Sequence, residues 1–343
     1  MRVPSISKFW YIIALVVVLI ISLVSAFGVG PAAVHPLVVL DIISNHTIGT
    51  EQVYDWPNLT AAIIWETRVP RVITGLFTGA VLAVSGAVLQ VVVRNPLADP
   101  YTLGLSSGAS TGAAFVVLVL GTTWLGVMTL PVFAFFGALV ATLATLLFAG
   151  RRPSPAKLIL SGLAVGYGFT AITNMLVFSA DNPETARSVL FWMLGSLARA
   201  SWQDAMICAL AALFVCLVVA YFGPALDALG GGDEAAQAVG INPNAVRIGL
   251  LIVVSIGVGI VVSASGGIGF VGLVVPHLVR GLLGRAQRMV TLGCVLLGSA
   301  FLVAADSIAR VALSPVELPI GVITGSVGAP FLLMLLHKSK TPL

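Results

Sequence analysis

Apolar runs of membrane-spanning length follow one another along almost the whole chain. A helix needs about 20 apolar residues to cross the hydrocarbon core of a bilayer. Of the 343 residues, 59% are hydrophobic and only 9% are charged, whereas a soluble domain carries roughly 25% charged residues. We therefore expect an all-α integral membrane protein, folded as a single transmembrane domain over residues 1–343 with no room for a soluble catalytic domain.

Polar breaks between the apolar runs predict ten transmembrane helices. The least obvious break is Gly266–Gly267, within an apolar run from Ile248 to Val279. As one helix this run would be about 48 Å long, which exceeds a hydrocarbon core of about 30 Å and favours a hairpin. The first run resembles a secretory signal with a small-residue site at Ala26, but its length favours a retained helix. The predicted spans are residues 9–29, 72–93, 101–120, 125–148, 158–178, 202–222, 248–264, 268–283, 289–313 and 318–336.

Basic residues are distributed unevenly between the two sides that these spans define. An even number of spans places both termini on one side, and twelve of the 17 Lys and Arg residues fall there. The positive-inside rule assigns that side to the cytoplasm. The twelve are Arg2, Lys8, Arg94, Arg151, Arg152, Lys157, Arg247, Arg280, Arg285, Arg288, Lys338 and Lys340, and the external five are Arg68, Arg71, Arg187, Arg199 and Arg310.

Small residues in the second span predict close helix packing. Gly75 and Gly79 share one helix face, and Gly86 follows further along the same span. In lipid, small residues of this kind allow another helix to approach closely. The span ends in a polar hinge, Arg94–Pro100, whose two prolines cannot continue a helix and whose polar side chains favour a membrane face.

Three segments are too polar to span the membrane. Residues 34–67 are expected to form an external loop with a short amphipathic helix near the interface, and residues 179–201 a second external segment. The cytoplasmic segment 223–247 is expected to form two short helices separated at Gly230–Gly232, the second beginning with Asp233 and Glu234. It is either a site that receives mechanical input from a partner or a capped connector.

Several classes of protein are excluded or weakened by motifs that the sequence lacks. No phosphate-binding P-loop is present, so a partner must bind any ATP that drives the chain. No hydrolase motif and no acidic pair at the centre of a span occurs, which weakens an intramembrane enzyme and an ion-coupled secondary transporter without removing either alternative. His277 stands alone and is interpreted as a structural histidine, so no metal or cofactor is expected in this chain. The sequence has no basic run with interleaved aromatic residues, so it does not indicate nucleic-acid binding.

Arg68, Arg71 and Arg310 lie at the outer ends of two predicted spans, against the general charge bias. Guanidinium groups on an outer face can bind the carboxylates of a docking protein in a bidentate manner and attract it electrostatically. The alternative is internal pairing of Arg310 with Asp306 one turn back and of Arg68 with Glu66.

Motifs distributed along residues 60–336 resemble the FecCD family, the permease subunits of ABC importers for iron-siderophores, haem and cobalamin. The resemblance is specific for the family and weak for the substrate, although family frequency favours an iron chelate over cobalamin. The motifs are Arg68-Val69-Pro70-Arg71, Gly86, Gln90, Arg94 to Pro100, Leu103-Gly104, Gly108-Ala109, Gly269 to His277, and Glu317 to Gly321.

The resemblance implies a type II ABC importer fold in the bacterial cytoplasmic membrane, with ten spans per subunit and both termini cytoplasmic. It implies a homodimer in lipid, two ATPase subunits that carry ATP and Mg, and a periplasmic or lipid-anchored substrate-binding protein. No catalytic residue is expected. The implied contact residues are Arg68, Arg71 and Arg310 for docking of the binding protein; Gly231, Gly232, Asp233, Glu234, Ala235, Ala238 and Gly240 for ATPase coupling; and Asn95, Pro96, Ser154, Pro155 and Ala156 for the cytoplasmic gate, where Pro155-Ala156 departs from the small hydroxyl residues of the cobalamin relative.

Overall fold

The computed structural model describes residues 5–30, 34–48, 57–121, 129–150 and 153–338. Within these ranges the regular secondary structure is helical, joined by turns and loops, apart from one isolated bridge between Leu313 and Val316. Seven helices are long and apolar enough to cross a membrane. Three shorter apolar segments occupy the other predicted span positions. The long helices are α1 (Ser5–Gly28), α4 (Val69–Val92), α6 (Thr129–Ala149), α7 (Pro155–Phe178), α9 (Trp202–Tyr221), α12 (Pro243–Ser265) and α14 (Gln287–Val311); the shorter ones are α5 (Leu105–Phe115) with η3 (Val116–Leu120), α13 (Val271–Leu283) and α15 (Ile320–Lys338).

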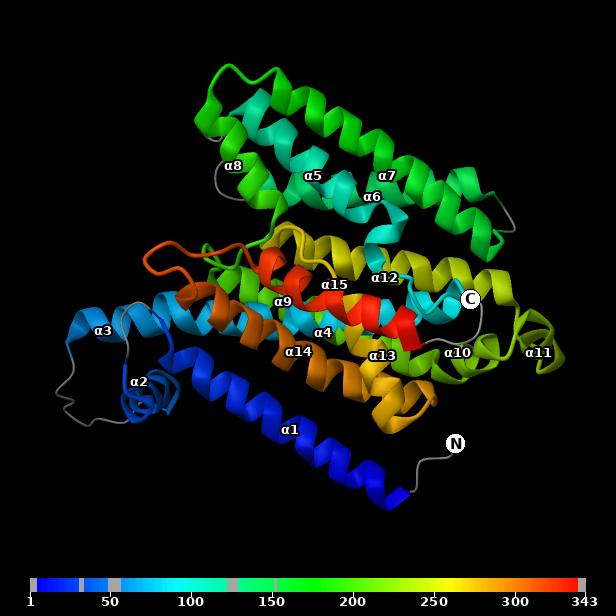
Figure 1. Ribbon diagram of the computed structural model, residues 1–343, viewed down its shortest axis with the longest axis horizontal. Coiled ribbons are helices and arrows are strands. Elements are labelled where there is room, and N and C mark those ends of the chain that lie inside the picture. Colours follow the sequence, from blue (N-terminus) through cyan, green and yellow to red (C-terminus); the bar gives the residue numbers. More distant parts are fainter. Residues whose placement is uncertain (1–4, 31–33, 49–56, 122–128, 151–152, 339–343) are drawn as a thin grey trace.

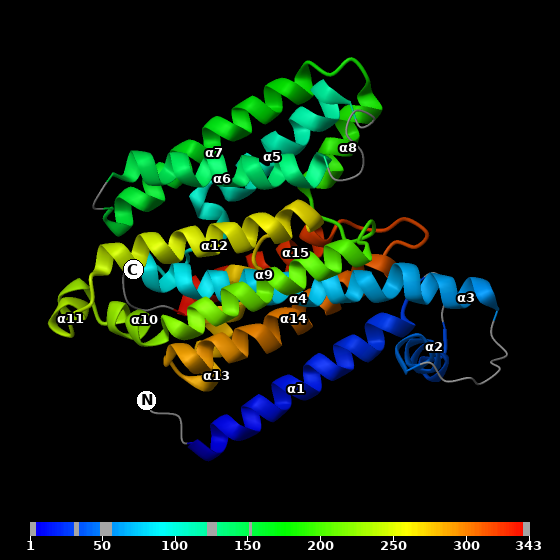
Figure 2. The same ribbon diagram turned by 180° about the vertical axis from the view of Figure 1, so that it is seen from behind.

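Helix α4 lies at the centre of the bundle, where it packs against α9, α12, α13 and α14. Helices α5, α6, α7 and α8 (Pro183–Met193) form a separate layer, and α12 lies between that layer and α4 (Figures 1 and 2). Helix α1 lies along α14 on the opposite side of the molecule. The order of apolar helices is therefore the predicted one.

Glycines let α4 approach two neighbouring helices at backbone distance, as the small residues in its sequence predict. A Cβ atom at Gly79 would overlap the carbonyl oxygen of Gly298 in α14, and one at Gly86 would overlap that of Gly272 in α13. Both contacts are backbone to backbone, so no side chain can move aside. They fix the separation of α4 from α13 and α14.

The predicted break between the seventh and eighth spans is confirmed. Helix α12 ends at Ser265 and α13 begins at Val271. Phe270, just before α13, has a left-handed backbone with φ of 70°, which is rare outside glycine. Non-helical backbone within a membrane must find polar partners inside the protein. The Tyr101 hydroxyl supplies one, since it accepts a hydrogen bond of 2.8 Å from the backbone N–H of Ile268.

The second span begins earlier than predicted. The expected external loop does contain a helix, α2 (Pro36–Ile48), but α3 (Asn58–Ala62) and the π-helical turn η1 (Ile63–Arg68) continue directly into α4. The resulting helix from Leu59 to Val92 has 34 residues. Its charged end stays helical because the guanidinium of Arg68 is buried against carbonyl groups of another helix.

The elements found at each end of the molecule are those that the predicted topology places on the same side of the membrane. The start of α1 and the end of α15 lie toward the same end as α10 (Gly223–Gly230) and α11 (Asp233–Ala238), whereas α2 and α3 lie at the other end (Figure 1). Some residues used in the sequence argument, residues 49–56 of the external loop and the basic residues Arg2, Arg151, Arg152 and Lys340, lie outside the described ranges.

Candidate functional site

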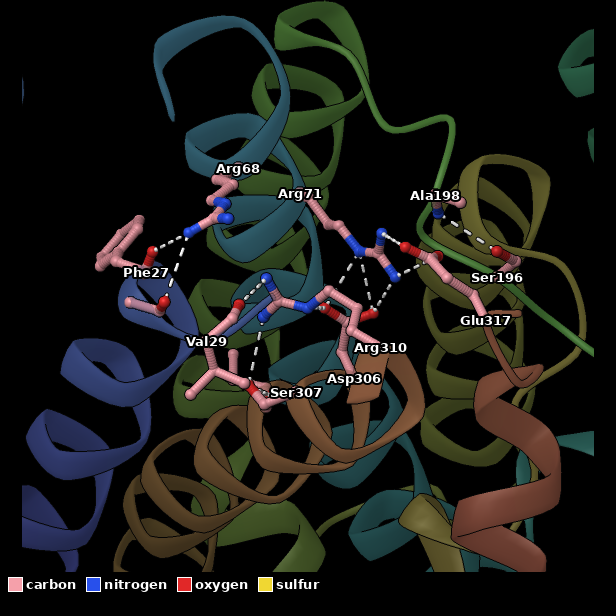
Figure 3. Close-up of polar contacts among 12 residues, drawn as sticks. Phe27, Val29, Arg68, Arg71, Ser196, Ala198, Asp306, Ser307, Arg310 and Glu317 are labelled. Atoms are coloured by element: carbon pink, nitrogen blue, oxygen red, sulfur yellow. Dashed lines mark hydrogen bonds and ion pairs between the residues drawn. The ribbon is translucent and has the colours of Figure 1, made fainter. Parts of the chain in front are cut away.

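Arg71 is the centre of an ion-pair cluster at the outer end of α4 (Figure 3). Its Nε and Nη2 donate to the carboxylate of Asp306 over 3.0–3.1 Å, and its Nη1 and Nη2 donate to Glu317 over 3.0–3.1 Å. One planar guanidinium thus binds two carboxylates, which is the geometry that arginine favours. Asp306 lies in α14 and Glu317 in the loop before α15, so Arg71 joins three parts of the outer face.

Arg310 and Arg68 bind the end of α1 beside this cluster (Figure 3). Arg310 pairs with Asp306 over 3.2 Å and donates to the carbonyl oxygen of Val29 over 3.0 Å. Arg68 donates to the carbonyl oxygens of Phe27 at 2.9 Å and Gly28 at 3.4 Å. These carbonyl groups end a helix and have no partner within it. The predicted internal pairing of Arg310 is confirmed.

The three arginines proposed for docking are buried. Arg68, Arg71 and Arg310 are 6%, 9% and 3% exposed. Their described contacts hold helices α1, α4 and α14 together, and the Glu317 side chain is the exposed member of the cluster at 33%. Docking of a binding protein through these residues stays a prediction.

The cytoplasmic segment is folded as predicted, with α10 and α11 separated at Gly231 and Gly232. One oxygen of Asp233, Oδ1, accepts hydrogen bonds from Nη2 of Arg94 at 2.7 Å and from Nη2 of Arg247 at 2.9 Å. The segment is therefore attached to the bundle by two ion pairs. The residues named for ATPase coupling that are exposed, and so available to a partner, are Gly231, Glu234, Ala235, Ala238 and Gly240.

The predicted gate residues lie at the ends of two helices. Asn95 and Pro96 follow α4 in a tight turn in which Oδ1 of Asn95 accepts a 2.9 Å hydrogen bond from the backbone N–H of Leu97. Ser154 is the N-cap of α7, and its Oγ accepts from the backbone N–H of Lys157 at 3.3 Å. Pro155 and Ala156 are the first residues of α7. Arg247 binds both of these regions, and the sequence pattern did not identify it as a site residue.

A cavity of about 900 Å³ opens beside the hinge at the cytoplasmic end. Arginine side chains outnumber acidic ones in its lining. Arg280 is held there through hydrogen bonds to the side-chain oxygen of Gln90 and to the carbonyl oxygen of Ala87. The lining residues are Gln90, Val91, Arg94, Pro96, Leu226, Asp227, Gly230, His277, Arg280, Gly281, Arg285, Ala286 and Gln287.

Among the described residues, no group of three or more His, Cys, Asp or Glu side chains is placed to hold a metal ion. His277 packs edge-on against Phe331 of α15 with 5.9 Å between ring centroids. The three cysteines are free.

Known proteins match this chain over most of its length. The FecCD transport family is matched over residues 15–338. The Fe(3+)-citrate import system permease protein YfmE of Bacillus subtilis is 34% identical over 326 residues, covering 95% of this chain and 94% of that protein. The vitamin B12 import system permease protein BtuC of Klebsiella pneumoniae is 38% identical over 278 residues, with coverages of 81% and 83%. A solved structure of a metal-chelate type ABC transporter in an inward-facing conformation has a TM-score of 0.82 at 27% identity, covering 96% of this chain and 99% of that one.

The fold and these similarities define a multi-pass helical permease of the ABC importer class. The chain belongs to the FecCD transport family. It is the transmembrane subunit of an importer and does not itself carry the ATPase. Importers of this class act together with ATPase subunits and a substrate-binding protein.

Proposed function

We propose that two copies of this chain form the membrane channel of an ATP-driven importer that moves an iron chelate, a ferric siderophore or haem, from a binding protein into the cytoplasm. The observation that carries the substrate assignment is the similarity to a ferric citrate permease along 95% of the chain. The similarity to a vitamin B12 permease supports cobalamin as the second candidate. ATP and Mg would be bound by two separate ATPase subunits.

Exposed side chains on α7 support the proposal that a second copy of the chain packs against this helix. Its side chains Tyr167, Met175 and Phe178 are 69%, 72% and 91% exposed in the single chain. Apolar side chains in a membrane protein can face lipid or another helix, and α7 begins with Pro155 and Ala156, two of the gate residues that the resemblance to the family implies. We propose that the partner copy covers part of this face and that membrane lipid covers the rest.

Separate uptake measurements on four compounds test the substrate assignment. The permease is reconstituted into liposomes with its ATPase and its binding protein, and ATP-dependent accumulation of radioactive ferric citrate, a ferric hydroxamate, haem and cobalamin is measured separately. We expect at least one iron chelate to accumulate and cobalamin not to accumulate. Accumulation of cobalamin alone would reverse the assignment in favour of the second candidate.

The backbone of Gly232 provides a test of the coupling role. With φ of 119° and ψ of 162°, it lies in a region that only glycine adopts without strain. Gly232→Ala is expected to add about 1–3 kcal/mol of strain between α10 and α11 and to lower uptake per ATP hydrolysed in the reconstituted importer. The matched control is Gly230→Ala, since Gly230 is helical and a Cβ atom there meets nothing within 4 Å. Equal uptake per ATP hydrolysed in the two variants would count against a role for this segment in coupling to the ATPase.

A further inference from the structure

Arg247 is a buried charge that contacts three other parts of the cytoplasmic end and one residue of its own helix. It lies in the second turn of α12 and is 1% exposed. Its Nε donates to the carbonyl oxygen of Val92 at 3.1 Å, and its Nη2 donates to Oδ1 of Asp233 at 2.9 Å. Its Nη1 donates to Oδ1 of Asn244 at 3.2 Å and reaches the carbonyl oxygen of Pro153 at 3.5 Å.

The four acceptors belong to elements that have different predicted roles. Val92 is the last residue of α4, directly before the hinge, and Pro153 precedes the N-cap of α7. Asp233 begins α11, the second helix of the segment that faces the ATPase. Asn244 is in α12 itself and orients the guanidinium from the same helix. One rigid, planar group therefore joins α11 to the end of α4 and to the turn before α7, which adjoin the two parts of the predicted gate.

Burial makes this arrangement sensitive to a movement of Asp233. A buried charge is stable only when it is paired and its donors are satisfied. The Asp233 side chain is 40% exposed, whereas that of Arg247 is 2% exposed, so a partner protein can reach the carboxylate but not the guanidinium. If Asp233 moves, the fixed fork of the guanidinium must turn, and its contacts with Val92 and Pro153 change together.

Arg94 adds a second connection through the same oxygen atom. Its Nη2 donates to Oδ1 of Asp233 over 2.7 Å, and its own backbone lies in the hinge with φ of 51°. Asp233 is thus connected to the hinge directly through Arg94, and indirectly through Arg247, which bonds to Val92 just before the hinge. The contact of Arg247 with Pro153 is the longest of the set at 3.5 Å, so it is the first to be lost when the guanidinium turns.

We propose that Arg247 is a positioning residue that transmits displacement of α11, through Asp233, to the hinge after α4 and to the turn before α7. The proposal rests on the proposed function, because it takes the movement of α11 to be driven by an ATPase. No group is transferred in this step: hydrogen bonds to Val92 and Pro153 exchange or lengthen while the ion pair to Asp233 persists.

The test compares Arg247→Gln, Arg247→Lys and Asp233→Asn in the full importer. Arg288→Gln is the matched control, since Arg288 is an exposed basic residue at the same end of the molecule. The first readout is the amount of chelate taken up per ATP hydrolysed. The second is the rate at which a maleimide labels Ala156→Cys, with Cys208, Cys216 and Cys294 replaced; Ala156 is exposed in the first turn of α7. A purely structural role would change abundance or thermal stability but not the dependence of labelling on ATP.

We expect Arg247→Gln to lower uptake per ATP by about tenfold, which corresponds to the loss of one hydrogen bond to a charged group. Labelling at position 156 should respond to ATP in the parent and in Arg288→Gln but not in Arg247→Gln. Arg247→Lys should fall between them, because it keeps the charge near Asp233 and loses the fork.

The outcomes separate this inference from the proposed function. If Arg247→Gln does not reach the membrane, Asp233→Asn tests the inference in its place. This variant alters the partly exposed partner, and the buried guanidinium keeps its other acceptors. Parent-like uptake per ATP together with parent-like labelling in Asp233→Asn or Arg247→Gln would overturn the inference while leaving the importer intact. A parent complex that imports no chelate with ATP would instead overturn the proposed function.

Discussion

Replacement of Gly86 by alanine is expected to remove most of the folded protein from the membrane. The added Cβ atom would overlap the carbonyl oxygen, carbonyl carbon and Cα of Gly272, so α4 and α13 must separate along their contact. Overpacking a well-packed interior costs about 1–3 kcal/mol where side chains can adjust. Here the overlapping atoms belong to the backbone and cannot adjust in this way. We therefore expect a loss in the free energy of unfolding of at least the upper end of that range, about 3 kcal/mol.

Folded yield in detergent and the midpoint of thermal unfolding measure this effect. The control is Gly249→Ala in α12, where a Cβ atom meets nothing within 4 Å. Alanine favours a helix over glycine by about 0.5–1 kcal/mol, so the control should be as stable as the parent or slightly more so. If Gly86→Ala and Gly249→Ala unfold at the same temperature, the close approach of α4 and α13 is not as described.

Loss of the Asp306 carboxylate is expected to destabilise the protein at least as much as Gly86→Ala. Asp306 is 2% exposed, accepts hydrogen bonds from Arg71 and forms an ion pair with Arg310, and both arginines are themselves buried. Asp306→Ala leaves two guanidinium groups without this partner, and removing one member of a buried ion pair costs about 3–5 kcal/mol. The outer ends of α4 and α14 should then separate, with a lower unfolding midpoint and increased proteolysis near α1.

Glu317 supplies the matched comparison within the same cluster. It pairs with the same arginine, but its side chain is 33% exposed. Glu317→Gln keeps an oxygen acceptor and loses an ion pair that water screens, so the expected loss of stability is below about 1 kcal/mol. Equal destabilisation by Asp306→Ala and Glu317→Gln would contradict the difference in burial on which this prediction depends.

Most of the fold could be predicted because it follows from local properties of the sequence. Apolar length identified the helices, the break at Gly266–Gly267 followed from bilayer thickness, and the glycines of α4 identified the face that packs most closely. The start of the second span was wrong because Glu66 and Arg68 look like loop residues. Arg68 stays helical through a bond to Phe27, 41 positions away, and no local pattern reveals such a partner.

The candidate site was predictable only in its residue types. Arg71 and Arg310 were identified as unusual external charges, and the pairing of Arg310 with Asp306 followed from helical spacing. The second partner of Arg71, Glu317, lies 246 residues away. Arg247 was counted only as a cytoplasmic charge, because two of its four acceptors are backbone oxygens that a sequence does not distinguish. Helix packing decides which of them it meets.

The most direct measurement is chelate accumulation in proteoliposomes that contain the permease, its binding protein and either an active or a hydrolysis-deficient ATPase. A further set of liposomes holds the permease alone under an imposed proton or sodium gradient. We expect accumulation against a concentration gradient only with the active ATPase and ATP. Accumulation by the permease alone, driven by an ion gradient, would contradict it.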